Sequence, residues 1–217
     1  MAFPLLLALL PLGTYLVLLG GLRMLGRPLV TTGGRDIFAL SIGISGLVAV
    51  GPGELFFPSA AGATFGPAVW PMLAVFYFLL VTMVILNSRP RLVVYGLGSQ
   101  DLIQPLLRAC ERIDPESVAD PSAGTVTLPS HAVHLRITSH ASSHSADVEA
   151  FEPNLSHAFW RMILAELRRE VAPLPAVAPR SGGMLSVAGL VMLLLVALQV
   201  MRAPSQVVEG LRDWLWR

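Results

Sequence analysis

Four of the five histidines fall within fourteen residues: His131, His134, His140 and His144. By residue type and spacing, this group is the strongest candidate for a reactive site in the sequence. Imidazole is the commonest protein ligand for zinc and related metals. His131 and His134 are three residues apart, so on an extended strand their side chains point to opposite faces. This spacing argues against their binding one metal ion together. The single cysteine, Cys110, is distant in the chain. We therefore expect no bound metal and no other cofactor.

Two further patterns contain the groups of a reactive site without its geometry. Ser142, His144 and Asp147 lie on one short loop, whereas hydrolytic triads draw their members from separate, rigid elements. The turn around Gly96 and Gly98 has two of the three glycines of a phosphate-binding fingerprint, and Asp101 would repel a phosphate there. We expect a protein that is not an enzyme.

Glu54 is the one carboxylate embedded in an apolar stretch, and ionisable groups inside a membrane are functional candidates by default. Its neighbours Pro52 and Gly53 place it at a helix end, where water can reach the carboxylate. We expect Glu54 to lie at the membrane–water boundary. The alternative is an intramembrane polar group that serves transport.

Long apolar stretches dominate the chain, and a helix needs roughly 20 mostly apolar residues to cross a bilayer. Hydrophobic residues make up 54% of the sequence and charged residues 13%, with a mean hydropathy of +0.67. The pattern predicts an integral membrane α-helical protein with four transmembrane helices: Leu5–Leu22, Ile37–Phe57, Ala68–Leu86 and Met184–Met201. The second stretch is the weakest, because only fourteen residues precede the break at Gly51.

Residues 91–175 have the patterning of a small soluble α+β domain, which follows the first three membrane helices (1–90). Short β-branched or alternating runs predict strands at Leu92–Tyr95, Thr125–Leu128, Ala132–Thr138 and Asp147–Phe151. Helical spacing predicts one helix from Ser99, which would cap it, and another at Asn154–Val171, with Phe159, Met162 and Ile163 facing inward. The order βαβββα predicts both helices on one face of an antiparallel or mixed sheet.

The C-terminal part of the chain is expected to form a Pro/Gly linker (176–182), the fourth membrane helix (183–202) and an amphipathic tail (203–217). In the tail, Val207, Leu211 and Trp214 fall on one side of a helix. That pattern fits a helix lying in the membrane interface, or equally a tail docked on the protein itself.

All 15 basic residues are arginine, which, with abundant alanine, glycine and proline, indicates a GC-rich bacterial genome and a location in the inner membrane. Four crossings place six arginines inside and three outside, and the cytoplasmic side carries the excess. A re-entrant second stretch gives the same count with the domain outside, so counting does not choose between them. We favour four crossings and a cytoplasmic domain, with these interface anchors: Arg89, Arg91, Arg180, Arg202, Trp214 and Trp216.

The net charge of +1 gives no reason to expect a nucleic-acid partner, which would need a basic patch. We expect a multi-pass membrane protein that presents the α+β domain as an interaction module. Its partners would be the lipid bilayer, another membrane protein or a second copy of the chain. A small transport or channel component that uses the broken second helix and Glu54 is the alternative. A metal-dependent membrane enzyme is a more distant one.

Overall fold

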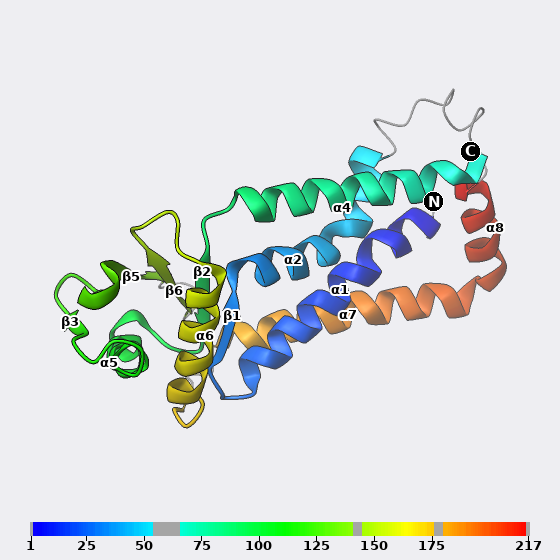
Figure 1. Cartoon of the computed structure of the whole chain (residues 1–217). Coiled ribbons are helices and arrows are strands. Elements are labelled where there is room, and N and C mark those ends of the chain that lie inside the picture. The colour runs from blue at the N-terminus through cyan, green and yellow to red at the C-terminus, as the bar shows by residue number, and fades with distance from the viewer. Residues whose placement is uncertain (1, 54–65, 141–144, 176–179, 216–217) are drawn as a thin grey trace. The chain divides into compact units, whose positions relative to one another are not determined.

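The computed structural model describes residues 2–53, 66–140, 145–175 and 180–215 (Figure 1). Two compact units divide the chain. The helical unit comprises Met1–Gly20, Ile37–Asn87 and Met184–Arg217, and the sheet unit comprises Gly21–Asp36 and Ser88–Gly183. The sheet unit is therefore built from two separate parts of the sequence, with two long apolar helices between them.

Among the described residues, four helices are long and apolar enough to cross a membrane, as predicted. They are α1 (Ala2–Met24), α2 (Gly33–Val48), α4 (Val69–Asn87) and α7 (Arg180–Arg202). A π-helical turn, Ala49–Gly53, extends α2, and a short 3-10 turn, Gly66–Ala68, precedes α4. Large apolar side chains are exposed along all four helices. Exposed apolar surface of that extent suits lipid rather than water.

The second helix begins at Gly33, four residues earlier than predicted. The hydroxyl of Thr32 accepts a hydrogen bond from the backbone N–H of Arg35 at 3.4 Å, and Asp36 in the first turn complements the helix dipole. Two glycines and two charged residues made this turn resemble a loop in the sequence. With it, the apolar helix Gly33–Gly51 reaches 19 residues. Glu54 and Phe57 lie outside the described residues.

Small residues let the helices of the helical unit pack closely. A Cβ atom on Gly46 would lie 1.9 Å from the carbonyl oxygen of Leu7 in α1. Likewise, a Cβ on Gly189 in α7 would lie 2.7 Å from the carbonyl oxygen of Gly13. Such contacts are the usual means by which membrane helices associate.

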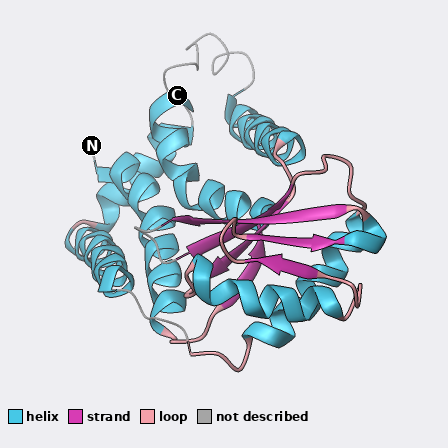
Figure 2. Cartoon of the chain, turned by 90° about the vertical axis from the view of Figure 1, so that its left-hand side faces the viewer, coloured by secondary structure: helices cyan, strands magenta, loops and turns pink. Residues whose placement is uncertain are grey.

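In the part of the chain that the structure describes, six antiparallel strands form one sheet in the order β1-β2-β6-β5-β4-β3. Figure 2 draws the sheet in magenta. Four of them match predicted strands: β2 (Arg91–Tyr95), β4 (Thr125–Leu128), β5 (Val133–His140) and β6 (Ser145–Ala150). The two edge strands, β1 (Leu29–Thr32) and β3 (Val118–Asp120), were not predicted. Both are very short, and strands of this length are defined by their partners more than by their own residues. The antiparallel option is the one observed.

Both helices of the sheet unit, α5 (Ser99–Glu111) and α6 (His157–Val171), pack on one face of the sheet, as predicted. In β5, Val133, Leu135 and Ile137 are buried in this core, while His134 and Arg136 are exposed. Two details differ from the prediction. Gly98, rather than Ser99, is the N-cap of α5, and Trp160 takes the core position on α6 that was expected for Met162, which is 46% exposed.

The edge strand β1 is held on both sides. It pairs with β2 from Leu29 opposite Tyr95 to Thr32 opposite Leu92. On its outer side, the guanidinium of Arg168 in α6 donates two hydrogen bonds to the carbonyl oxygen of Val30, at 3.0 and 3.1 Å. Pro28, just before the strand, has no N–H to offer another chain. These features protect an edge that would otherwise be open to further pairing.

Replacing Gly46 with alanine should lower the thermal unfolding midpoint of the detergent-purified protein. The added methyl group would overlap the α1 backbone, and overpacking typically costs about 1–3 kcal/mol. Gly21→Ala is the matched control, because nothing lies within 4 Å of that position. Equal midpoints for the two variants would contradict the close α1–α2 contact.

Candidate functional site

The face of the sheet opposite α5 and α6 carries a group of polar side chains that we call the junction cluster: Arg23, Asp36, Arg91, Tyr95, Asp147 and Glu149. Alternation along the strands puts them there, because Leu92, Val94, Ala146 and Val148 occupy the apolar face. Arg23 and Asp36 come from the ends of α1 and α2 and belong to the sheet unit. The cluster therefore joins the two sequence segments of that unit.

Arg91 lies between two carboxylates of β6. Its Nη1 atom is 3.3 Å from Asp147 and 3.9 Å from Glu149. The side chain of Asp147 is only 9% exposed, so its charge depends on this pairing more than a surface charge would. Gly33 allows the approach of the arginine stem, because a Cβ at that position would lie 2.7 Å from Cγ of Arg91.

Tyr95 links the sheet to the ends of both N-terminal helices. Its hydroxyl donates a 2.7 Å hydrogen bond to Oδ1 of Asp36, at the start of α2. The guanidinium carbon of Arg23, at the end of α1, lies 5.5 Å from the centre of the Tyr95 ring, within the range of a cation–π interaction. Together these contacts fix β1 and the two helix ends against β2.

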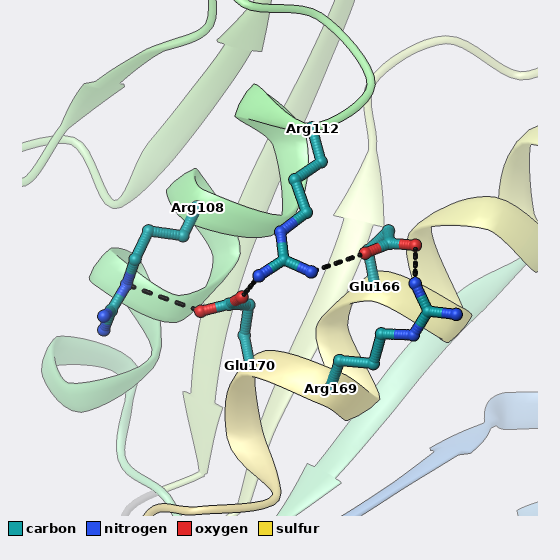
Figure 3. A network of polar contacts seen from close by, with 5 residues as sticks. All are labelled: Arg108, Arg112, Glu166, Arg169 and Glu170. Atoms are coloured by element: carbon teal, nitrogen blue, oxygen red, sulfur yellow. Dashed lines mark hydrogen bonds and ion pairs between the residues drawn. The ribbon is translucent and has the colours of Figure 1, made fainter.

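A second polar network joins α5 to α6 (Figure 3). Arg112 pairs with Glu170 and, at 3.1 Å, with Glu166. Arg169 also bonds Glu166, at 2.9 Å, and Arg108 lies 3.7 Å from Glu170. Because the arginines are more than half exposed, each pair stabilises the fold only modestly. The network aligns the two helices with each other.

The histidines singled out in the sequence are dispersed. His131 is exposed in the turn Pro129–His131, and His134 binds Glu152 through its ring at 2.9 Å and through its backbone N–H. Burial raises the pKa of Glu152, but the hydrogen bonds from His134 outweigh this and hold the pKa below its usual range. His140 ends β5, opposite Ser145, while His144 and Ser142 lie outside the described residues.

Among the residues that the structure describes, no three His, Cys, Asp or Glu side chains come together closely enough to hold a metal ion. Since His144 and the side chain of His140 are not among them, the expected absence of a metal stays a prediction. Asp147, which the triad pattern contained, is paired with Arg91 instead.

Asp114 is a buried carboxylate that holds two turns of the sheet unit together. It accepts hydrogen bonds from the N–H and hydroxyl of Ser130 at 2.8 and 2.9 Å and from the N–H of Glu116 at 3.2 Å. Burial alone would raise its pKa, but these hydrogen bonds hold the pKa below the ordinary value. The carboxylate thereby ties the turn after α5 to the turn before β5.

In the helical unit, the tail forms α8 (Pro204–Leu215) and docks on the protein itself. The Trp214 ring stacks on Trp70 with centroids 3.4 Å apart and lies 5.8 Å from Phe3. Gly210 permits the contact, since a Cβ there would lie 2.7 Å from Cβ of Phe3. An interfacial position for this helix stays a prediction, and Trp216 lies outside the described residues.

The remaining predicted interface anchors are arginines that lie at or near the ends of helices and strands. Arg89 is exposed between α4 and β2, and Arg202 is exposed at the end of α7. Arg180 begins α7, and its side chain is outside the description. Arg91 lies in β2 within the junction cluster.

The junction cluster was not predicted from the sequence. Its one local signal was the spacing of Asp147 and Glu149, which are two apart on a predicted strand and so share one face of it. The contributions of Arg23 and Asp36 required knowledge of β1. No protein-family model, curated protein or solved structure matches the chain.

Replacing Arg91 with glutamine should destabilise the protein by about 1–3 kcal/mol, because it leaves the nearly buried charge of Asp147 without its cation. Adding Asp147→Asn to this variant should recover part of the lost stability, because it removes the unpaired carboxylate charge. Chemical denaturation of the two single variants and the double variant measures the coupling. Simple additivity of the two losses would show that the pair does not interact.

Proposed function

We propose that this chain is a multi-pass protein of a bacterial inner membrane, without enzymatic activity, that presents the sheet unit as an interaction module on the cytoplasmic side. The observation that carries the proposal is the pairing of β1 with β2. It supports a topology in which the chain crosses the membrane an even number of times between the two strands.

The β1–β2 pairing limits how many times the chain can cross the membrane between the two strands. Residues 29–32 follow α1, whereas residues 91–95 follow α4, and α2 and α4 lie between them. Two strands can pair only if both are on the same side of the membrane, which requires an even number of crossings in between. If α2 entered and left on one side, α4 would carry β2 to the opposite side from β1. The ladder thus favours a spanning α2 over a re-entrant one.

Contacts within the helical unit support the same topology. Phe38 lies 6.4 Å from Phe78, and the Tyr77 hydroxyl bonds the carbonyl of Ser41. These contacts pack α2 against α4, and Figure 1 shows the two helices running in opposite directions. Phe3, Trp70 and Trp214 meet at the start of α1, the start of α4 and the tail, which alternating crossings place on one side.

The orientation follows from the arginines. With four crossings, the module side carries Arg23, Arg27, Arg35, Arg89, Arg91 and Arg180, while Arg202, Arg212 and Arg217 lie on the other side. An excess of arginine near the ends of membrane helices marks the cytoplasmic side. The sheet unit would accordingly face the cytoplasm, with both termini outside.

The polar groups of the sheet unit support a binding rather than a catalytic role. The junction cluster and the α5–α6 network connect segments of the unit to one another, and Asp114 stabilises turns. A rigid platform of this kind suits presentation of a surface to a partner at the membrane. The transport alternative relies on Glu54, for which no contact is described.

Labelling of single introduced cysteines with a membrane-impermeant maleimide tests the proposal. Ala123, in the exposed turn between β3 and β4, and Ser205, in the exposed start of α8, provide the two sites. The native Cys110 need not be removed, since burial raises the pKa of its thiol to about 12 and keeps it unreactive.

Ser205→Cys should be labelled in cells whose outer membrane is permeabilised, and Ala123→Cys only in inverted inner-membrane vesicles. Detergent-solubilised protein, in which both sites must react, is the control. The reverse pattern would place the module outside the cytoplasm. Labelling of both sites from one side would contradict four crossings.

A further inference from the structure

Arginines in the sheet unit differ in whether they have a partner. Five of those on α5, α6 and β2 are engaged: Arg108, Arg112 and Arg169 with glutamates, Arg168 with a carbonyl, and Arg91 with two carboxylates. Arg161 on α6 and Arg136 on β5 are exposed. Arg27, Arg35 and Arg89 are exposed, and among the described residues their side chains have no ion pair or hydrogen bond. We call these three residues the arginine collar.

The collar lies around the β1–β2 ladder, next to the ends of three apolar helices. Thr32 and Leu92 form the last pair at one end of the ladder. Arg35 comes three residues after Thr32, and Arg89 comes three residues before Leu92, so both lie beyond this end. Arg27 lies two residues before Leu29, at the other end, where Tyr95 is the opposite residue. The antiparallel register thus distributes the three charges over both ends of one short ladder.

Nearby carboxylates do not neutralise the collar. The segments 21–36 and 88–91 together contain five arginines and a single acidic residue, Asp36. Asp36 already accepts the hydroxyl of Tyr95. By contrast, the three arginines of the α5–α6 network share two glutamates. The segments 21–36 and 88–91, which adjoin the apolar helices in the sequence, therefore carry positive charge that no nearby carboxylate balances.

We propose that the arginine collar binds the phosphate groups of anionic phospholipids in the adjoining leaflet. This inference rests on the proposed function, because it assumes that α1, α2 and α4 end at a membrane surface. A guanidinium offers a planar fork of donors that matches phosphate oxygens, and its apolar stem can extend along the lipid boundary. An anionic leaflet also attracts juxtamembrane arginines electrostatically. A phosphatidylcholine headgroup, which has no net charge, offers less.

Native mass spectrometry of the full chain in neutral detergent tests the proposal with two lipid probes, phosphatidylglycerol and phosphatidylcholine. The wild-type protein should retain phosphatidylglycerol preferentially. The variant R27Q/R35Q/R89Q should lose affinity for it by on the order of tenfold or more, since each juxtamembrane arginine contributes several-fold. R27K/R35K/R89K should keep most of the preference, because the charge remains.

The matched control is R108Q/R136Q/R161Q, which removes the same charge at three exposed arginines elsewhere in the sheet unit and should keep the preference. An equal loss in both triple variants would reduce the effect to net charge and overturn the proposal. So would displacement of the lipid by an equal concentration of inorganic phosphate. The measurement needs no sidedness, so a module found outside the cell would overturn the proposed function and leave this result standing.

Discussion

The rest of the structure depends on one contact, the pairing of β1 with β2. The four residues of β1 lie between α1 and α2, whereas β2 follows α4. Leu29–Thr32 completes the edge of the sheet, and its register with β2 sets which helix ends lie near the sheet. Without β1, Arg23 and Asp36 would have no reason to meet Tyr95, and Arg168 would lose its carbonyl acceptor. In a membrane, the ladder would also require an even number of crossings between its two strands, because both strands must share one compartment.

The two units are stabilised by different forces. In the sheet unit, apolar residues of six strands and two helices are removed from water, so the hydrophobic effect dominates, and the polar groups orient segments rather than supply most of the stability. In the helical unit, lipid would compete for the same apolar surfaces. Close contact at Gly13, Gly46 and Gly189 therefore replaces hydrophobic burial as the source of specificity.

The sequence predicted those features that follow from local periodicity. Long apolar runs predicted the four helices, and alternation in Val133–Thr138 predicted the buried and exposed faces of β5. The start of α2 was missed because Gly33 and Gly34 disfavour a helix, whereas in the structure Thr32 caps it and Asp36 complements its dipole. β1 and the junction cluster were missed for a non-local reason. A four-residue strand is stabilised by a partner about sixty positions away, and nothing in its own residues specifies that partner.

An engineered disulfide across the ladder tests the central claim most directly. Thr31 and Val93 are opposite residues in the register, and opposite Cα atoms in an antiparallel pair lie about 4.5–5.5 Å apart, within disulfide range. With both replaced by cysteine, mild oxidation in membranes should yield the linked peptide by mass spectrometry. The pair Thr31→Cys and Val118→Cys, on opposite edges of the sheet, should not cross-link. Failure of the first pair, with both thiols still open to alkylation after denaturation, would contradict the ladder and the topology that rests on it.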